Sequence, residues 1–232
     1  TVQMQSTWHH DIVADALTIN NMSPRSQAVD AMGYPHIAYG YNKLYHSWYN
    51  GSVWQTEIVD DAPQTGGNAE IVFDSLDQLH IGYLDDENQA IKYAVQMPGG
   101  WSIESVPVAE SALSKFSMSV DDADNVAFII DHPDSDSLSL YYKTSTGWSN
   151  EVAGTYDVSI TDIALTFHGA EPRIVYSGGM YGSIDVKLLY KTGSGWNTAF
   201  LDSSGYGGFS ISVCTDSSSD VTSAAYLDTD NG

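Results

Sequence analysis

The stretch VFDSLDQLHIGYLDDENQAIKYAVQMPGGWSIESV, residues 72–106, decides the fold of this chain. It contains four short runs of alternating apolar and polar residues, separated by residues that favour turns: Asp, Asn, Gly and Pro. A similar stretch, AVDAMGYPHIAYGYNKLYHSWYNGSVWQTEIV, occupies residues 28–59. No helical periodicity of useful length lies between the runs. The pattern therefore predicts a small antiparallel sheet that occurs more than once.

Tryptophan marks the period of the repeat. Five tryptophans follow one another at intervals of 46, 47, 47 and 48 residues: Trp8, Trp54, Trp101, Trp148 and Trp196. Four strands in such a period are typical of one propeller blade. The chain ends two strands into a fifth unit and begins with two strands of the same kind. We therefore expect an all-β, five-bladed β-propeller over residues 1–232, with its fifth blade shared by residues 1–14 and 207–232.

The charge of the chain limits its partners. It has 8 Lys and Arg against 30 Asp and Glu, a formal net charge of −22. This charge repels phosphate backbones and anionic membranes, so we expect no nucleic acid and no membrane insertion. It also predicts marine or saline surroundings, because salt screens the self-repulsion, or neutralisation by bound cations. No apolar run reaches the length of a membrane-spanning helix, and any signal peptide is expected to be removed or to lie outside these residues.

The two quoted stretches resemble a known repeat. Secreted bacterial propeller proteins carry S-L-A-x-D-x-x-G-x-P-H-I-x-Y repeats with L-K-Y-A and G-x-W-x-x-E-x-V segments, and the resemblance covers essentially the whole chain. It implies a propeller fold and a secreted or cell-surface location, but no particular activity, because function in that repeat family is largely unassigned. In blade number and length the chain is also similar to tachylectin-2, a five-bladed sugar-binding lectin, although none of that lectin's sequence motif is present.

Residues that recur at one position of several repeats are more simply explained by folding than by catalysis. His36 and His80 share a strand position, so a structural role is favoured over a metal site. Asp30, Asp74 and Asp121 share a turn in which an aspartate side chain bonds backbone amides. A repeated acidic position after the tryptophans is expected to face solvent: Asp11, Glu57, Glu104 and Glu151.

Sequence motifs of common hydrolases are missing. The chain contains no GxSxG, no HExxH and no phosphate loop. Its two arginines, Arg25 and Arg173, are too few for the arginine triad of sialidases. The single cysteine, Cys214, excludes an intrachain disulfide and lies in an alternating run where we expect a buried apolar role. These observations disfavour catalysis but leave the question open.

Acidic turns on one predicted face of the propeller suggest a cation site. The loops YLDDENQ, IIDHPDSDS and LDTDNG alternate carboxylates with Asn and Ser oxygens, which are hard ligands of the kind calcium takes. Asp228 and Asp230 open the sequence DTDNG, although no Glu follows at the distance an EF-hand requires. Solvated acid is the favoured interpretation, and calcium bound at Asp228 and Asp230 is the alternative.

Residues that break the repeat are the better candidates for a ligand site. Trp48 is the only tryptophan outside the periodic position, and the spacing places it in the connection between the third and fourth strands of the first blade. Exposed rings beside carboxylates suit a sugar, which stacks its apolar face and donates hydroxyl protons. The predicted ligand-binding residues are Tyr41, Trp48, Asp85, Asp131, Tyr181, Tyr206 and Asp228.

Three functions remain open at this point. The favoured one is a non-catalytic extracellular recognition or adhesion module that binds a carbohydrate or a protein surface, as a monomeric domain or as part of a larger protein. The second is a small glycan-processing enzyme of the glycoside hydrolase type, with carboxylates from several blades meeting above the axis. The third is a structural surface spacer. Compact blades with few long loops favour the first.

Overall fold

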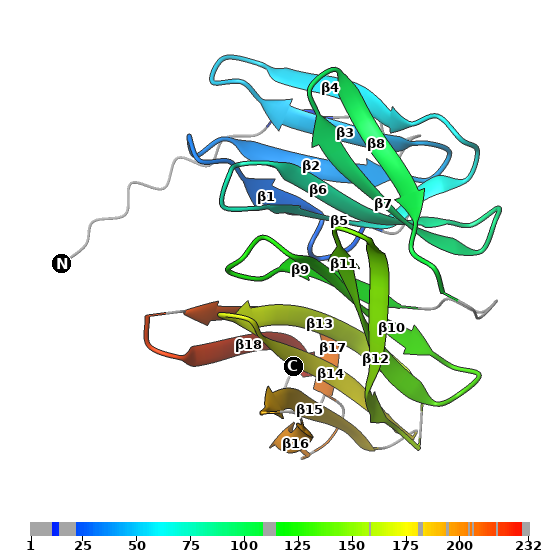
Figure 1. Cartoon of the computed structure of the whole chain (residues 1–232), viewed down its shortest axis with the longest axis vertical. Coiled ribbons are helices and arrows are strands. Elements are labelled where there is room, and N and C mark those ends of the chain that lie inside the picture. The colour runs from blue at the N-terminus through cyan, green and yellow to red at the C-terminus, as the bar shows by residue number, and fades with distance from the viewer. Residues whose placement is uncertain are drawn as a thin grey trace.

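The computed structural model describes residues 11–13, 22–108, 115–157, 159–180, 183–193, 195–203, 205, 207–216 and 218–228. Within these ranges the chain forms five antiparallel sheets and no helix, as the alternating runs predict. Figure 1 shows the first two sheets at the top and the later ones below. No helix capable of crossing a membrane occurs in this part of the chain.

Four of the sheets have four strands each, hydrogen-bonded in chain order. The first sheet comprises β1 (Gln27–Val29), β2 (Pro35–Gly40), β3 (Leu44–Tyr49) and β4 (Trp54–Asp60). The second comprises β5 (Thr65–Phe73), β6 (Leu79–Asp85), β7 (Ala90–Met97) and β8 (Gly100–Ser105). The third comprises β9 (Phe116–Val120), β10 (Val126–His132), β11 (Ser137–Thr144) and β12 (Gly147–Thr155). The fourth comprises β13 (Ile160–His168), β14 (Glu171–Met180), β15 (Ser183–Thr192) and β16 (Gly195–Asp202).

The fifth sheet consists of β17 (Gly207–Asp216) and β18 (Val221–Asp228) among the described residues. The strands predicted to complete it, in residues 1–14, fall mostly outside the described ranges, and residues 11–13 form no strand. The all-β architecture of repeated four-stranded sheets is therefore confirmed. Sharing of the fifth blade between the two ends of the chain stays a prediction.

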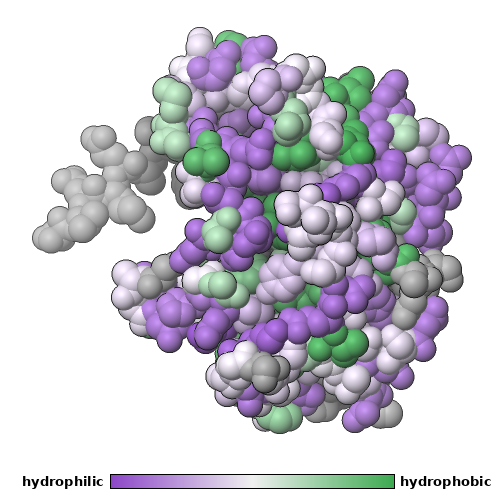
Figure 2. Space-filling view, viewed as in Figure 1, coloured by the Kyte–Doolittle hydropathy of each residue, from purple (hydrophilic) through white to green (hydrophobic). Residues whose placement is uncertain are grey.

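The core lies in the seams, which are the interfaces between consecutive sheets. Trp148 of the third sheet packs edge-on against Tyr93 of the second, with 5.8 Å between ring centroids. Trp101 of the second sheet contacts His46 of the first in the same way. Trp101 and Trp148 thus fill the seams, where burial of apolar surface drives the sheets together. Figure 2 shows mainly hydrophilic residues on the face in view, in keeping with the net charge of −22.

The repeated aspartates hold the hairpins between the first and second strands of the sheets, as predicted. Oδ1 of Asp30 accepts hydrogen bonds from the amides of Met32 and Tyr34, and Asp74 and Asp121 bond their own turns in the same way. We call this end of the sheets the turn end. The opposite end, which carries the β2–β3, β6–β7 and β10–β11 connections, is the loop end.

Some expectations about single residues are wrong. Trp48 lies within β3, paired with Gln55 of β4, and not in the connection between the two strands. Cys214 is exposed, because the alternation of β17 places it on the same face as Ser212 and Asp216. The acidic position after the tryptophans also does more than face solvent. Glu57 accepts a hydrogen bond from His46 of the adjacent strand. Glu104 and Glu151 form ion pairs with lysines of the next sheet, Lys143 and Lys191.

Candidate functional site

The innermost strands converge on a buried ion pair. The Glu70 carboxylate in β5 is 2% exposed and accepts hydrogen bonds from Nε of Arg25 at 2.6 Å, from Oγ of Ser117 at 3.1 Å and from the Met118 amide at 2.8 Å. Arg25 also donates from Nη1 to the carbonyl of Ile211 in β17, at 2.6 Å. Arg25 lies just before β1 of the first sheet, and its partners and those of Glu70 belong to the second, third and fifth sheets. One guanidinium and one carboxylate therefore join four sheets.

The fourth sheet adds a second carboxylate to this cluster. Oδ1 of Asp162 lies 3.9 Å from Nη2 of Arg25, and its Oδ2 accepts a hydrogen bond from the Ile211 amide at 2.6 Å. Burial raises the pKa of Glu70, although the Arg25 guanidinium opposes the shift. Both oxygens of Glu70 are bonded to fixed donors. This arrangement braces the sheets against one another and leaves Glu70 poorly placed to move a proton.

A pocket of about 200 Å³ opens beside the ion pair at the loop end. Its walls include Arg25, Asn68, Glu70, Lys115 and Asp162. Sequence reasoning missed Arg25 and Glu70 as a pair. The signal was present, because Glu70 interrupts a buried apolar strand and Arg25 is one of only two arginines in the chain.

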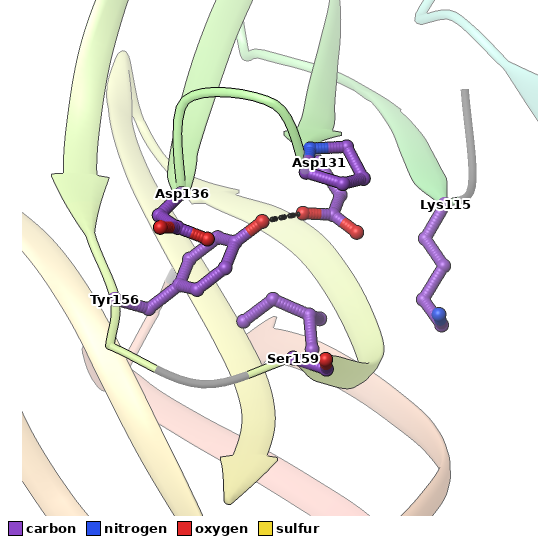
Figure 3. Close-up of a pocket in the computed structure, with 7 residues that line it drawn as sticks. Lys115, Asp131, Asp136, Tyr156 and Ser159 are labelled. Atoms are coloured by element: carbon purple, nitrogen blue, oxygen red, sulfur yellow. Dashed lines mark hydrogen bonds between the residues drawn. The ribbon is translucent and has the colours of Figure 1, made fainter. Parts of the chain in front are cut away.

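A second pocket, of about 260 Å³, lies between the third and fourth sheets and shares Lys115 with the first. Figure 3 shows Asp131 at its top, Tyr156 and Lys115 on opposite sides, and Ser159 below. The Tyr156 hydroxyl donates a hydrogen bond to Oδ1 of Asp131, which is 2% exposed. We call this the Asp131 pocket; its lining residues are Lys115, Asp131, Pro133, Asp136, Tyr156, Ser159 and Ile160.

Strand register places Asp131 in this pocket. Asp131 pairs with Leu138 of β11, and Leu84 pairs with Ile91 of β7. Leu138 stands 47 positions after Ile91, which is one repeat, so Asp131 is equivalent to Leu84. The residue equivalent to Asp85 is His132. A shift of one residue turns a strand side chain to the other face of its sheet. Asp85 and Asp131 look alike in the sequence, but they face different seams.

Asp85 lies in a closed ion cluster between the first and second sheets. Its side chain is 1% exposed and bonds the Lys92 ammonium at 2.8 Å, and Lys92 also contacts Asp60 at 3.1 Å. Burial raises the pKa of Asp85, but hydrogen bonds from Lys92 and Asn88 outweigh it, and the net shift is downward. A ligand that bound Asp85 would have to displace these partners.

Of the other predicted site residues, the structure describes Trp48, Tyr41 and Asp228. Tyr41 follows β2 at the loop end and is 47% exposed, and Asp228 ends β18. Tyr181, Tyr206 and Asp230 lie outside the described residues, so the predicted calcium site at Asp228 and Asp230 stays a prediction. In the part of the chain that the structure describes, no group of three or more His, Cys, Asp or Glu side chains is arranged to hold a metal ion.

Trp48 lies in a third pocket, of about 460 Å³, at the turn end of the seam between the first and second sheets. His46 stacks on one face of the Trp48 indole, with 5.0 Å between centroids and 16° between planes. We call this the Trp48 pocket; its lining residues are Asp30, Met32, Tyr34, His36, His46, Trp48, Tyr49, Asn50 and Gln96. Asp131 and Trp48 thus belong to separate pockets at opposite ends of the sheets.

No protein-family model matches the sequence, and no curated protein matches it significantly. Among solved structures, AofleA from Arthrobotrys oligospora is 16% identical with a TM-score of 0.56, covering 72% of this chain and 53% of its own. A variant of the lectin from Aleuria aurantia, in complex with Fucα1-6GlcNAc, is 13% identical with a TM-score of 0.56, covering 81% and 65%. A variant of an exo-β-1,3-galactanase from Phanerochaete chrysosporium, with β-1,3-galactotriose, is 8% identical with a TM-score of 0.55, covering 79% and 50%.

At these identities the similarity shows the fold alone. This chain has a propeller-type, all-β architecture, and it spans about half to two-thirds of the length of the structures it matches. Lectins and a glycoside hydrolase occur among them, so the fold does not distinguish binding from catalysis.

Proposed function

We propose that this domain is a non-catalytic carbohydrate-binding module and that the Asp131 pocket is its primary site. The observation that carries the proposal is the pocket itself, in which one aromatic ring, two carboxylates, an ammonium group and a hydroxyl surround about 260 Å³. Sites for drug-sized ligands start at about 300 Å³, so this one suits a single sugar residue.

The lining residues match the chemistry of a sugar ring. Asp131 and Asp136 accept hydrogen bonds from hydroxyl groups, whereas the Lys115 ammonium and the Ser159 hydroxyl donate them. The Tyr156 ring offers an apolar face to the C–H side of the sugar. Asp131 is held by Tyr156, so its carboxylate is oriented before a ligand arrives, which lowers the entropy cost of binding.

A binding role is favoured over hydrolysis by the state of the axial carboxylates. A glycosidase needs one carboxyl group that can donate a proton and a second that acts as base or nucleophile. Glu70 and Asp162 are the axial pair, and the raised pKa of Glu70 suits an acid. Both Glu70 oxygens, however, are bonded to Arg25, Ser23, Ser117 and the Met118 amide. Hydrolysis at the axis is therefore our second candidate.

The module is proposed to be a closed five-bladed ring, found outside the cell. Closure is supported by the hydrogen bond from Arg25, beside the first sheet, to Ile211 in the fifth. It is also supported by the position of Trp8, one period before Trp54. A secreted or cell-surface location is supported by the resemblance to secreted propeller repeats and by the high acidic charge.

A glycan array tests the proposal. Wild-type protein is applied with and without calcium, next to Asp131→Asn and a matched control, Asp134→Asn, which makes the same change in the exposed part of the loop beside the pocket. We expect calcium-independent binding to a defined glycan class, about tenfold or more weaker in Asp131→Asn and unchanged in Asp134→Asn. Equal binding by all three proteins would overturn the site. Release of sugar from bound glycans, measured by mass spectrometry, would favour the hydrolase.

A further inference from the structure

We propose that the Trp48 pocket is a second saccharide-binding site, at the end of the sheets opposite the Asp131 pocket. The ligand class rests on the proposed carbohydrate function, but the site rests on its own geometry. The pocket opens in the seam between the first and second sheets, whereas the Asp131 pocket lies between the third and fourth. The two pockets share no lining residue.

A row of three rings forms the platform of this site: His46 stacks on Trp48, and His36 lies beside His46, joined to it by a hydrogen bond between ring nitrogens. His46 is 1% exposed and lies between His36 and Trp48, with 5.0 Å between ring centroids on each side and interplanar angles of 22° and 16°. His46 covers one face of the Trp48 indole, and Trp48, which is partly buried, lines the pocket. An aromatic face at the wall of a polar pocket is the surface on which the apolar side of a sugar stacks.

Hydrogen bonds hold the rings of His36 and His46 in one arrangement. Oε1 of Glu57 lies 3.0 Å from Nδ1 of His46, and Nε2 of His46 lies 2.9 Å from Nδ1 of His36. A carboxylate only accepts, so Nδ1 of His46 carries the proton and its Nε2 accepts a hydrogen bond from His36. Each ring is thereby fixed by its neighbour. The Trp48 platform is formed before any ligand binds, which reduces the entropy cost of binding.

Polar side chains surround the platform. Oδ1 of Asn50 accepts hydrogen bonds from the Ser52 and Val53 amides, so its NH₂ group points away from these bonds and remains a donor. Gln96, from the end of β7, adds a second amide that is exposed. Amide groups beside an aromatic plane provide both donors and acceptors for sugar hydroxyls.

The two sites would make the domain bivalent. One glycan chain would bind at the loop end and another at the turn end, so a single domain would bridge two chains. When both ligands are attached to one surface or polymer, the second binding event becomes intramolecular and the apparent affinity rises by about 10² or more. This consequence sets the proposal apart from a lectin with one site.

NMR with the isolated domain tests the second site. The Trp48 indole N–H signal, assigned with Trp48→Phe, is followed as methyl α-fucoside, β-1,3-galactotriose, lactose and chitotriose are added. The Ile160 methyl signals report the Asp131 pocket separately. We expect a saturable shift of the Trp48 signal with at least one sugar. Trp48→Ala should weaken that binding about tenfold or more, and Phe200→Ala, which removes an exposed ring outside both pockets, should leave it unchanged.

The outcomes separate the two proposals. A Trp48 shift that persists in Asp131→Asn supports a second site, whatever happens at Ile160. A Trp48 signal that no sugar moves, or that responds only when Asp131 is intact, overturns it. If only the Ile160 signals fail to respond, the primary site is wrong and the Trp48 site stands. If Trp48→Ala does not fold, Gln96→Ala replaces it, because that side chain is exposed, and a several-fold loss is expected.

Discussion

The seam between the first and second sheets and the seam between the third and fourth are built from equivalent strands, but they differ at the loop end. In the first seam, Lys92 joins Asp60 and Asp85 in a buried cluster. In the seam between the third and fourth sheets, strand pairing places Gly154 at the position equivalent to Asp60 and Gly178 at the position equivalent to Asp85. The ion cluster therefore cannot form there.

Backbone contact adds a second difference. A Cβ atom on Gly66, whose φ is +95°, would lie 3.0 Å from Cα of Gly40, so the first and second sheets touch at this point. Asp131 is the residue of the third sheet equivalent to Gly40. A side chain in that place keeps the backbones apart, and the Asp131 pocket occupies the gap. A pocket can thus arise in a repeat by loss of a closing contact, without a change of fold.

The largest effect is expected from breaking the ion cluster. Lys92→Met leaves Asp60 and Asp85 buried without their cation, and we expect the free energy of unfolding to fall by about 3 kcal/mol at pH 7. Lys187 is the matched control, because it pairs with Tyr176 in the fourth sheet as Lys92 pairs with Tyr83 in the second. It pairs with a partly exposed aspartate, so Lys187→Met should cost less than about 1 kcal/mol. Urea unfolding measures both; equal losses would contradict the comparison.

The second largest loss of stability is expected from disturbing the backbone contact between the first and second sheets. Gly66→Ala places a methyl group against Cα of Gly40 and strains a left-handed residue, so we expect a loss of about 2–3 kcal/mol. Gly99→Ala is the control, because φ there is +102° and nothing lies within 4 Å of the new methyl group. It should cost about 1 kcal/mol, the strain alone. If thermal or urea unfolding gave the two variants equal stability, the close approach would not matter.

The pH dependence of stability distinguishes the seams at the turn end. Burial lowers the pKa of His46 below its ordinary value of 6.5, despite the hydrogen bond to Glu57. The unfolded chain therefore binds this proton first, and the free energy of unfolding falls as the pH drops below about 6.5. Leu140 stands at the equivalent position of the third sheet and does not titrate. His46→Leu should fold with a shallower decline between pH 7 and 5; an unchanged slope in urea titrations would argue against this role.

The smallest change in stability is expected from filling the Asp131 pocket, in the seam between the third and fourth sheets. Asp131→Leu copies Leu84 of the second sheet, and the leucine would fill the pocket with apolar surface. Loss of the hydrogen bond from Tyr156 opposes this gain, so the net change should stay within about 1 kcal/mol. Glycan binding at the loop end should vanish while the Trp48 signal still responds to sugar. Binding that survives the leucine would place the primary site elsewhere.

The sequence predicts the repeat well because the repeat is local. The tryptophan interval and the alternating runs depend only on residues within one sheet, and the turn role of Asp30 follows from side chains near in sequence. Seam contents depend on which residues of two sheets meet. Register shifts, as between Leu138 and Ser139, move that meeting point by one residue. The 47-residue spacing aligns Asp131 with Leu84 and not with Asp85, but it does not show what either aspartate meets across its seam.

The partner of a long side chain is also outside what spacing can predict. Arg25 and Glu70 are 45 residues apart and meet only because two first strands approach the same axis. Trp48 was found because it breaks a pattern, but its neighbours His46 and Asn50 depend on the length of β3. Periodicity thus predicts the sheets, whereas the pockets between them can be seen only in the three-dimensional structure.

The hydrogen bond from Arg25 to Ile211 has a consequence for how this repeat protein melts. In a linear array each unit contacts only its neighbours, so terminal units fray before the centre does. Here one guanidinium, at a sequence separation of 186 residues, joins the beginning of the array to its last sheet. Neither end can open without breaking that contact. The sheets should lose their structure together, in one cooperative step.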